Sequence, residues 1–301
     1  MTEKTNLYEA HQPAISIDQQ ISNLRSKGLI INDEDYVSSV LNDISYFRLI
    51  KAYSLGLKVK NGNYYDNVLF EDIVQLYLFN SNFRQALFPQ IEKVEINLRC
   101  RLSGYFCEKY GVLGYEEKDN FALSDANFQL LHDDLQREIS RNTRSPFIKN
   151  FQTNYSDGKI PLYALVEIMS FGALSKLYKA MKNEDKKAIA IQYGIRFTYL
   201  ESWIESLSYV RNICAHYGRL YNAKLSKAPR LYKQYVADKI SNYRIFATLL
   251  TLKDLLPNDR HWYDFIQTTE MMIDKYPSVK LQRLGFPTNW VNMLTHTEPM
   301  A

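Results

Sequence analysis

Apolar residues recur at helical spacing along most of the chain, and sustained alternation of apolar and polar positions is almost absent. Ile17, Ile21 and Leu24, for example, share one face of a helix that Gly28 ends. The same spacing predicts helices over residues 17–27, 33–43, 70–110, 125–140, 145–155, 161–168, 171–181, 183–191, 198–217, 239–256 and 260–275. The predicted fold class is therefore all-α, a helical bundle.

Pro89 interrupts the longest of these periodic segments, residues 70–110. Proline lacks a backbone donor, and its ring clashes with the preceding turn of a helix. We therefore expect either two helices here or one kinked helix.

Two segments near the N-terminus depart from simple periodicity. Residues 46–53 are apolar on most sides and are expected to be buried, with Arg48 either paired with a carboxylate or functional. Asn61-Gly62-Asn63 is a turn signal that can close a short β-hairpin between residues 57–60 and 64–65. These turns suggest an N-terminal helical lobe over residues 1–65 and a second helical domain over 66–301, unless the two form one domain.

Composition is that of an ordinary globular protein, with 46% hydrophobic and 23% charged residues and a net charge of +4. No run of 18 apolar residues and no apolar leader occurs, so we expect a cytoplasmic protein without a membrane partner. Cys100, Cys107 and Cys214 show no metal-ligand spacing and are expected to be reduced packing residues. We expect neither a metal nor a cofactor.

Chemistry is concentrated near the end of the predicted 198–217 helix. Two arginines, an amide and an imidazole lie there within nine residues: Arg211, Asn212, His216 and Arg219. Four-residue spacing puts the amide and the imidazole on one helical face, and the long Arg211 side chain can reach a ligand bound there. The cluster suits a large anionic ligand rather than a metal, because arginine does not ligate metals. The alternative is an arginine and a histidine that cap the carbonyls of a buried helix end, with Gly218 as the C-cap residue.

The next stretch, residues 217–244, contains seven basic residues and a single acid. Five tyrosines are interleaved with them. Cations for phosphates and rings for bases are what a single-stranded nucleic acid requires, whereas the alternative is a solvated basic face with tyrosines packed inward. The residues predicted to contact the nucleic acid are Tyr217, Arg219, Tyr221, Lys224, Lys227, Arg230 and Lys233.

A supporting polar face is expected on the second half of the 70–110 segment. Glu92, Glu95 and Arg99 recur there on a single face of the helix. They form either a solvated stripe of salt bridges or a polar surface turned toward the 211–219 cluster, where it anchors the arginines.

The pattern from Arg211-Asn212 to His216 resembles the signature of the HEPN superfamily, an arginine followed after four to six residues by a histidine. Other stretches resemble bacterial Abi-like abortive-infection proteins of the AbiD and AbiF type. These stretches are residues 44–49, 92–101, 209–222 and 284–290, which span most of the chain in order.

This resemblance implies a HEPN-like bundle and metal-independent cleavage of RNA in phage defence or growth arrest, as in toxin–antitoxin systems. A small noncoding RNA is a further implied partner. In such a reaction the RNA 2′-hydroxyl attacks the neighbouring phosphorus, His216 transfers a proton, Arg211 neutralises the phosphorane, and Asn212 orients His216 or the phosphate. One histidine for two proton transfers predicts a homodimer with facing motifs. A non-catalytic RNA-binding module and a helical interaction protein are the alternatives.

Overall fold

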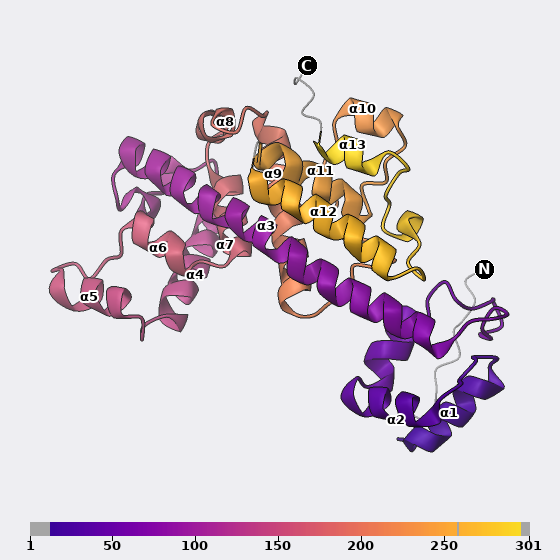
Figure 1. The fold of residues 1–301 in the computed structure, drawn as a ribbon. Helices are drawn as coiled ribbons and strands as arrows, with labels where there is room; N and C mark the ends of the chain where they lie inside the picture. Colours follow the sequence, from indigo (N-terminus) through magenta and orange to yellow (C-terminus); the bar gives the residue numbers. More distant parts are fainter. Residues whose placement is uncertain (1–12, 258, 296–301) are drawn as a thin grey trace, which may run out of the picture. The chain divides into compact units, whose positions relative to one another are not determined.

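A computed structural model describes residues 13–257 and 259–295, and every named element in these residues is a helix (Figure 1). The described part of the chain contains isolated β-bridges but no named strand. The predicted all-α class is confirmed. No helix within the described residues combines the length and apolarity needed to cross a bilayer.

The described residues pack as two compact units, each with its own core. Unit 1 contains the described residues up to Phe79 together with Tyr276–Val279, and unit 2 contains the other described residues. Because the division falls inside a helix, the units are not separated by a linker. The domain boundary at residue 66 stays a prediction.

Unit 1 is built on α1 (Ile17–Ser26), α2 (Glu34–Asp43) and the first turns of α3 (Phe70–Tyr110). Each short helix has an N-cap: Ser16 forms a capping box with Gln19, and the Asp33 side chain accepts from the Tyr36 amide. Tyr276–Val279 joins this unit through Ser278, whose hydroxyl lies 2.6 Å from Asp72 Oδ1.

The segment expected to be buried at residues 46–53 is only half buried. It forms a π-helix, Phe47–Lys51, which turns Leu49 and Ile50 into the core. Phe47 is 79% exposed and Arg48 is also exposed, so this part of the prediction is wrong. The single turn has one face toward the core and leaves the other in solvent.

The Asn61-Gly62-Asn63 turn brings Lys58 and Tyr64 together as an isolated antiparallel bridge. The Val59 amide donates to the Asn63 carbonyl at 2.9 Å, and Gly62 takes a φ of 90°, which the turn requires. The pairing expected from the sequence is present, but it is too short to count as two strands.

α3 is one helix of 41 residues with Pro89 inside it, so of the two alternatives the single helix is observed. Pro89 and Gln85 are both exposed, and water can therefore satisfy the Gln85 carbonyl that proline leaves without a backbone donor. On the opposite side Leu87 and Ile91 are fully buried, which holds the two halves of the helix in one path.

The other helices of unit 2 follow the predicted ranges closely up to residue 215. They are α4 (Asp125–Arg141), α5 (Pro146–Asn154), α6 (Leu162–Ile168), α7 (Phe171–Ala180), α8 (Asn183–Ile191), α9 (Phe197–Ala215), α10 (Lys233–Ala237), α11 (Ile245–Leu255), α12 (Arg260–Lys275) and α13 (Trp290–Thr295). The helix expected over 239–256 begins only at Ile245, because Lys239 takes a left-handed φ of 58° at the end of α10. α10 and α13 were not predicted.

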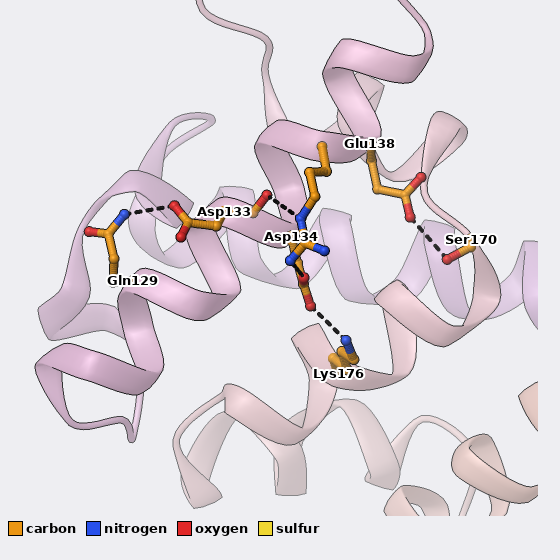
Figure 2. A network of polar contacts seen from close by, with 7 residues as sticks. Gln129, Asp133, Asp134, Glu138, Ser170 and Lys176 are labelled. Carbon is orange, nitrogen blue, oxygen red and sulfur yellow. Dashed lines mark hydrogen bonds and ion pairs between the residues drawn. The ribbon is translucent and has the colours of Figure 1, made fainter.

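α4 rests on α7 through a buried leucine face with polar contacts at its edge (Figure 2). Lys176 Nζ lies 2.6 Å from Asp134 Oδ2, and the Ser170 hydroxyl donates to Glu138 at 3.1 Å. The Lys176 ammonium lowers the pKa of the Asp134 carboxyl. Such exposed pairs are worth at most about 1 kcal/mol each, so apolar burial provides most of the packing energy.

α9 is the central helix for the site. It packs against α7, α8 and α11, and its Leu200, Ile204, Leu207 and Val210 side chains are fully buried. This packing fixes the axis of α9 and therefore the position of its C-terminal end, where the motif lies.

Candidate functional site

α9 ends in a Schellman motif that runs through the predicted cluster. His216 is the C-cap residue, and the Gly218 amide donates to the Ile213 carbonyl at 2.7 Å while the Tyr217 amide donates to Cys214 at 3.3 Å. Tyr217 takes the left-handed φ of 57° that glycine usually supplies at this position. The prediction that Gly218 supplies the cap conformation is therefore wrong by one residue.

Gly218 is required for another reason. A Cβ atom at this position would lie 2.8 Å from Ile213 Cγ2 and 3.1 Å from the Ile213 carbonyl oxygen. Only glycine allows the chain to pass this close to the last turn of α9 as it reverses.

Two buried side chains of α3 hold this reversal in place. Arg84 Nη1 donates to the Cys214 carbonyl at 3.3 Å, which compensates the negative end of the α9 dipole. Asn80 accepts from the Leu220 and Tyr221 amides at 2.8 and 2.9 Å, and its Nδ2 donates to the Gly218 carbonyl at 3.3 Å. The chain leaving the motif is thus fixed by one amide side chain.

Further along α3, Glu95 lies between two arginines. One of its oxygens accepts from Arg99, whose Nη2 also donates to the Met169 carbonyl at 2.7 Å. The other oxygen lies 3.5 Å from Arg211 Nε, an ion pair without hydrogen-bond geometry. The Arg211 guanidinium also lies 5.6 Å from the centre of the Phe88 ring and stays 33% exposed.

The predicted supporting face is therefore divided by burial. Glu95 and Arg99 are buried, and Glu95 is turned toward Arg211, as in the second of the two alternatives, whereas Glu92 is exposed. We call the five polar residues between these two helices the α3–α9 seam. They are Asn80, Arg84, Glu95, Arg99 and Arg211.

Asn212, His216 and Tyr217 form the opposite kind of surface, which we call the motif face. All three are exposed, Tyr217 at 68%, and the His216 amide donates to the Asn212 carbonyl one turn before it. Within the described residues the His216 ring has no hydrogen-bond or ion-pair partner. An imidazole in this position can exchange a proton with a ligand or with water.

The basic segment after the motif runs back along α9. Lys227 Nζ lies 2.6 Å from Glu205, and near the other end the Trp203 indole donates to the Arg230 carbonyl at 2.7 Å. Lys224 and Lys233 are exposed as well, and Lys224 Nζ lies 4.9 Å from the centre of the Tyr243 ring.

The tyrosines of this segment divide between the surface and the core, and Tyr217 and Tyr243 are exposed. Tyr221 is buried, and its hydroxyl accepts from the Lys280 amide at 3.2 Å, while Tyr235 is also buried. Arg219 is partly buried and donates to the Tyr221 carbonyl at 3.0 Å. Of the predicted RNA contacts, the cations and Tyr217 reach the surface, and Tyr221 packs inward.

The family model of Abi-like proteins matches residues 39–222. The chain belongs to the Abi-like protein family. The match includes the motif face and the whole α3–α9 seam, and it ends before most of the basic segment. No curated protein and no solved structure matches the chain.

The described residues of the Abi-like chain place neither a reactive cysteine nor a cluster of metal ligands at this site. Burial raises the pKa of the Cys214 thiol to about 12, with the Arg84 charge opposing the shift, so the thiol is not a nucleophile near neutral pH. In the part of the chain that the structure describes, no group of three His, Cys, Asp or Glu side chains converges as metal ligands would. Cys100, expected to pack, is exposed.

Two residues of the Abi-like site, Asn80 and Arg84, were not identified from the sequence. They stand four apart among buried positions such as Phe79 and Phe83, where a polar side chain needs a partner. That interruption of an apolar face is the signal that could have revealed them. Their partners lie more than a hundred residues away in sequence, so no local pattern identifies the contact.

Proposed function

We propose that this Abi-like protein is a metal-independent endoribonuclease of the HEPN type that acts in bacterial phage defence. The family suggests a role in abortive infection. The observation that carries the catalytic part is a cation paired with a buried carboxylate on the same helix as an exposed imidazole. Arg211 Nε lies 3.5 Å from buried Glu95, and His216, whose ring has no hydrogen-bond or ion-pair partner within the described residues, lies at the end of α9.

The capping alternative explains these residues less well. A carbonyl of the last turn of α9 accepts from Arg84, and Arg211 pairs with a carboxylate on α3. His216 has no partner within the described residues. A residue retained to cap the helix would be expected to contact one of its carbonyls.

In the proposed reaction the RNA 2′-oxygen attacks the adjacent phosphorus and the bond to the 5′-oxygen breaks. One imidazole accepts the proton of the 2′-hydroxyl, and another proton goes to the leaving 5′-oxygen. Arg211 neutralises the charge that develops on the phosphorane, and Asn212 orients the phosphate or His216. The products are a 2′,3′-cyclic phosphate and a 5′-hydroxyl.

Two proton transfers on opposite sides of one phosphate are most simply made by two histidines. A homodimer with facing motif faces supplies the second His216, and the exposure of this residue leaves it accessible to a second copy. Cleavage should then depend on the concentration of dimer. A protein that sediments as a monomer and retains full cleavage would contradict this arrangement.

The function is tested by incubating purified protein with mixed cellular RNA in excess EDTA. Wild type should cleave, and His216→Ala should lose about a hundredfold or more of the rate with no loss of thermal stability, because its exposed ring has no hydrogen-bond or ion-pair partner within the described residues. His261→Ala is the matched control, since that exposed histidine lies on α12, outside the motif face. Binding without cleavage by wild type would favour an RNA-binding module. Equal cleavage by wild type and His216→Ala would contradict the proposal.

A further inference from the structure

A second basic surface lies in unit 1, outside the candidate active site. Residues 44–65 contain no Asp or Glu. Among the basic residues of this stretch are Lys51, Lys58 and Lys60, and its aromatic residues include Phe47 and Tyr65.

The fold brings Lys58 to the Tyr64 ring, with the charges of Lys51 and of Lys27, at the end of α1, close to Lys58, and Lys60 follows two residues later in the chain. The Tyr64 amide donates to the Lys27 carbonyl at 2.8 Å, and Tyr64 is bridged to Lys58. Lys58 Nζ lies 4.5 Å from the centre of the Tyr64 ring. Burial and the neighbouring ammonium groups of Lys27 and Lys51 lower the pKa of Lys58, which shows that like charges are close to one another here.

Within the described residues, these lysines have no carboxylate partner. None of Lys27, Lys51, Lys58 and Lys60 forms an ion pair within the described residues. By contrast, Lys109 of unit 2 pairs with both Glu184 and Asp185. Mutual repulsion of unpaired lysines destabilises the free protein slightly, and a bound polyanion relieves it.

Aromatic rings flank the lysines and face solvent. Phe47 is 79% exposed and Tyr65 is 51% exposed. Phe47 begins the π-helix, an element that occurs frequently at functional sites. Separate exposed rings between cations suit bases stacked along a single strand, whereas a membrane-binding helix presents a continuous apolar stripe.

We propose that this surface, composed of Lys27, Lys51, Lys58, Lys60, Phe47 and Tyr65, binds single-stranded nucleic acid. The lysines contact successive phosphates, and the two rings stack on bases. The surface is separate from the motif face and does not depend on the proposed cleavage reaction.

The test measures binding in the His216→Ala protein, so that cleavage cannot affect the result. Fluorescence polarisation with oligouridine of roughly 20 nucleotides, longer than one site, is recorded over a range of salt concentrations. The cluster variant is Lys27→Gln/Lys51→Gln/Lys60→Gln. The control variant, Lys149→Gln/Lys179→Gln/Lys187→Gln, removes the same charge from exposed lysines of unit 2.

The cluster variant should reduce the magnitude of the slope of log affinity against log salt by about 2, because each of the lost phosphate contacts contributes about 0.7. The control variant should leave the slope unchanged. Phe47→Ala should weaken binding to the single strand about fivefold or more and leave binding to a duplex of the same length unchanged. Matching probes of oligodeoxythymidine distinguish DNA from RNA as the ligand.

Equal salt slopes for the cluster and control variants would overturn the proposal. Equal effects of Phe47→Ala on single strand and duplex would overturn its single-stranded part. Loss of pelleting with phosphatidylserine vesicles in the cluster variant, with an unchanged slope for RNA, would assign the surface to a membrane instead.

Discussion

The α3–α9 seam and the motif face meet on α9, where Arg211 of the seam is followed directly by Asn212 of the motif face. The two regions are opposite in burial and in the number of contacts that their side chains make. In the seam, each of the five polar side chains has a partner: Asn80 and Arg84 bind backbone groups around the end of α9, and Glu95 lies between Arg99 and Arg211. On the motif face, Asn212 and His216 are exposed, and Tyr217 is held in a strained conformation.

The buried side chains of the α3–α9 seam position the end of α9, and the exposed side chains of the motif face are the ones that a ligand can reach. Buried polar side chains that bind protein groups have a restricted geometry, although Arg84 Nε, Arg99 Nη1 and Arg211 Nε have no hydrogen-bond partner within the described residues. Exposed side chains on a rigid helix end are available to a ligand and need little reorganisation. Arg211 belongs to both regions, because its Nε faces Glu95 while a third of its side chain remains exposed.

The largest predicted effect on stability comes from Glu95. Glu95→Ala would leave the charges of Arg99 and Arg211 without a counter-ion between α3 and α9, and it should lower the free energy of unfolding by about 3 kcal/mol. Denaturation in urea measures this loss. Glu92→Ala is the matched control because Glu92 is exposed one turn earlier on α3, and it should change stability by less than about 0.5 kcal/mol. Similar losses in both variants would show that Glu95 does not organise the seam.

Asn80→Ala should cost about 2 kcal/mol of unfolding free energy, because it leaves the buried Leu220 and Tyr221 amides without an acceptor. Amide hydrogen exchange should accelerate at these two positions before α9 itself is affected. Asn97→Ala, at an exposed position of the same helix, should be neutral or slightly stabilising. Unchanged exchange at residues 220 and 221 in Asn80→Ala would contradict the assigned contacts.

Tyr217→Gly should raise the unfolding free energy by about 1 kcal/mol, since glycine adopts the left-handed conformation without strain. If the exposed Tyr217 ring stacks on RNA, the same substitution weakens RNA binding. The opposite change, Gly218→Ala, should destabilise by about 1 kcal/mol or more, because its Cβ atom would be 2.8 Å from Ile213 Cγ2. A loss of stability in Tyr217→Gly would mean that the ring is needed for packing.

The smallest predicted effect concerns the rate at which the Cys214 thiol is alkylated. Burial raises the pKa of Cys214 to about 12, so between pH 7 and 9 its thiol stays protonated and should not react with iodoacetamide in the folded protein. Exposed Cys100 should react under the same conditions. Mass spectrometry of the alkylated peptides measures both rates. Alkylation of the two cysteines at the same rate would show that the end of α9 opens in solution.

Local patterns in the sequence were sufficient for most helices and insufficient for the contacts between them. The ranges of α4, α8 and α12 follow from apolar periodicity and from residues such as Ser124, which caps α4. α10 is only five residues long, too short for a periodic signal. The exposed Phe47 could not be predicted either, since which side of a π-helix faces the core depends on the elements packed against it.

The candidate site shows the same division. The residue types and spacing of Arg211, Asn212 and His216 are visible in the sequence, and the position of Glu95 beside Arg211 was one of two alternatives. The roles of Asn80 and Arg84 depend on contacts across 138 and 130 residues of sequence, which no local pattern specifies. Likewise, only the fold shows that Tyr221 packs inward while Tyr217 faces solvent.

The central claim, that the motif face catalyses transesterification, is tested most directly by the chemical ends of the RNA fragments produced in excess EDTA. Attack by the 2′-hydroxyl predicts 2′,3′-cyclic phosphate and 5′-hydroxyl ends, which should disappear in His216→Ala and persist in His261→Ala. Fragments with 5′-phosphate and 3′-hydroxyl ends, or cyclic-phosphate fragments that persist in His216→Ala, would contradict the claim.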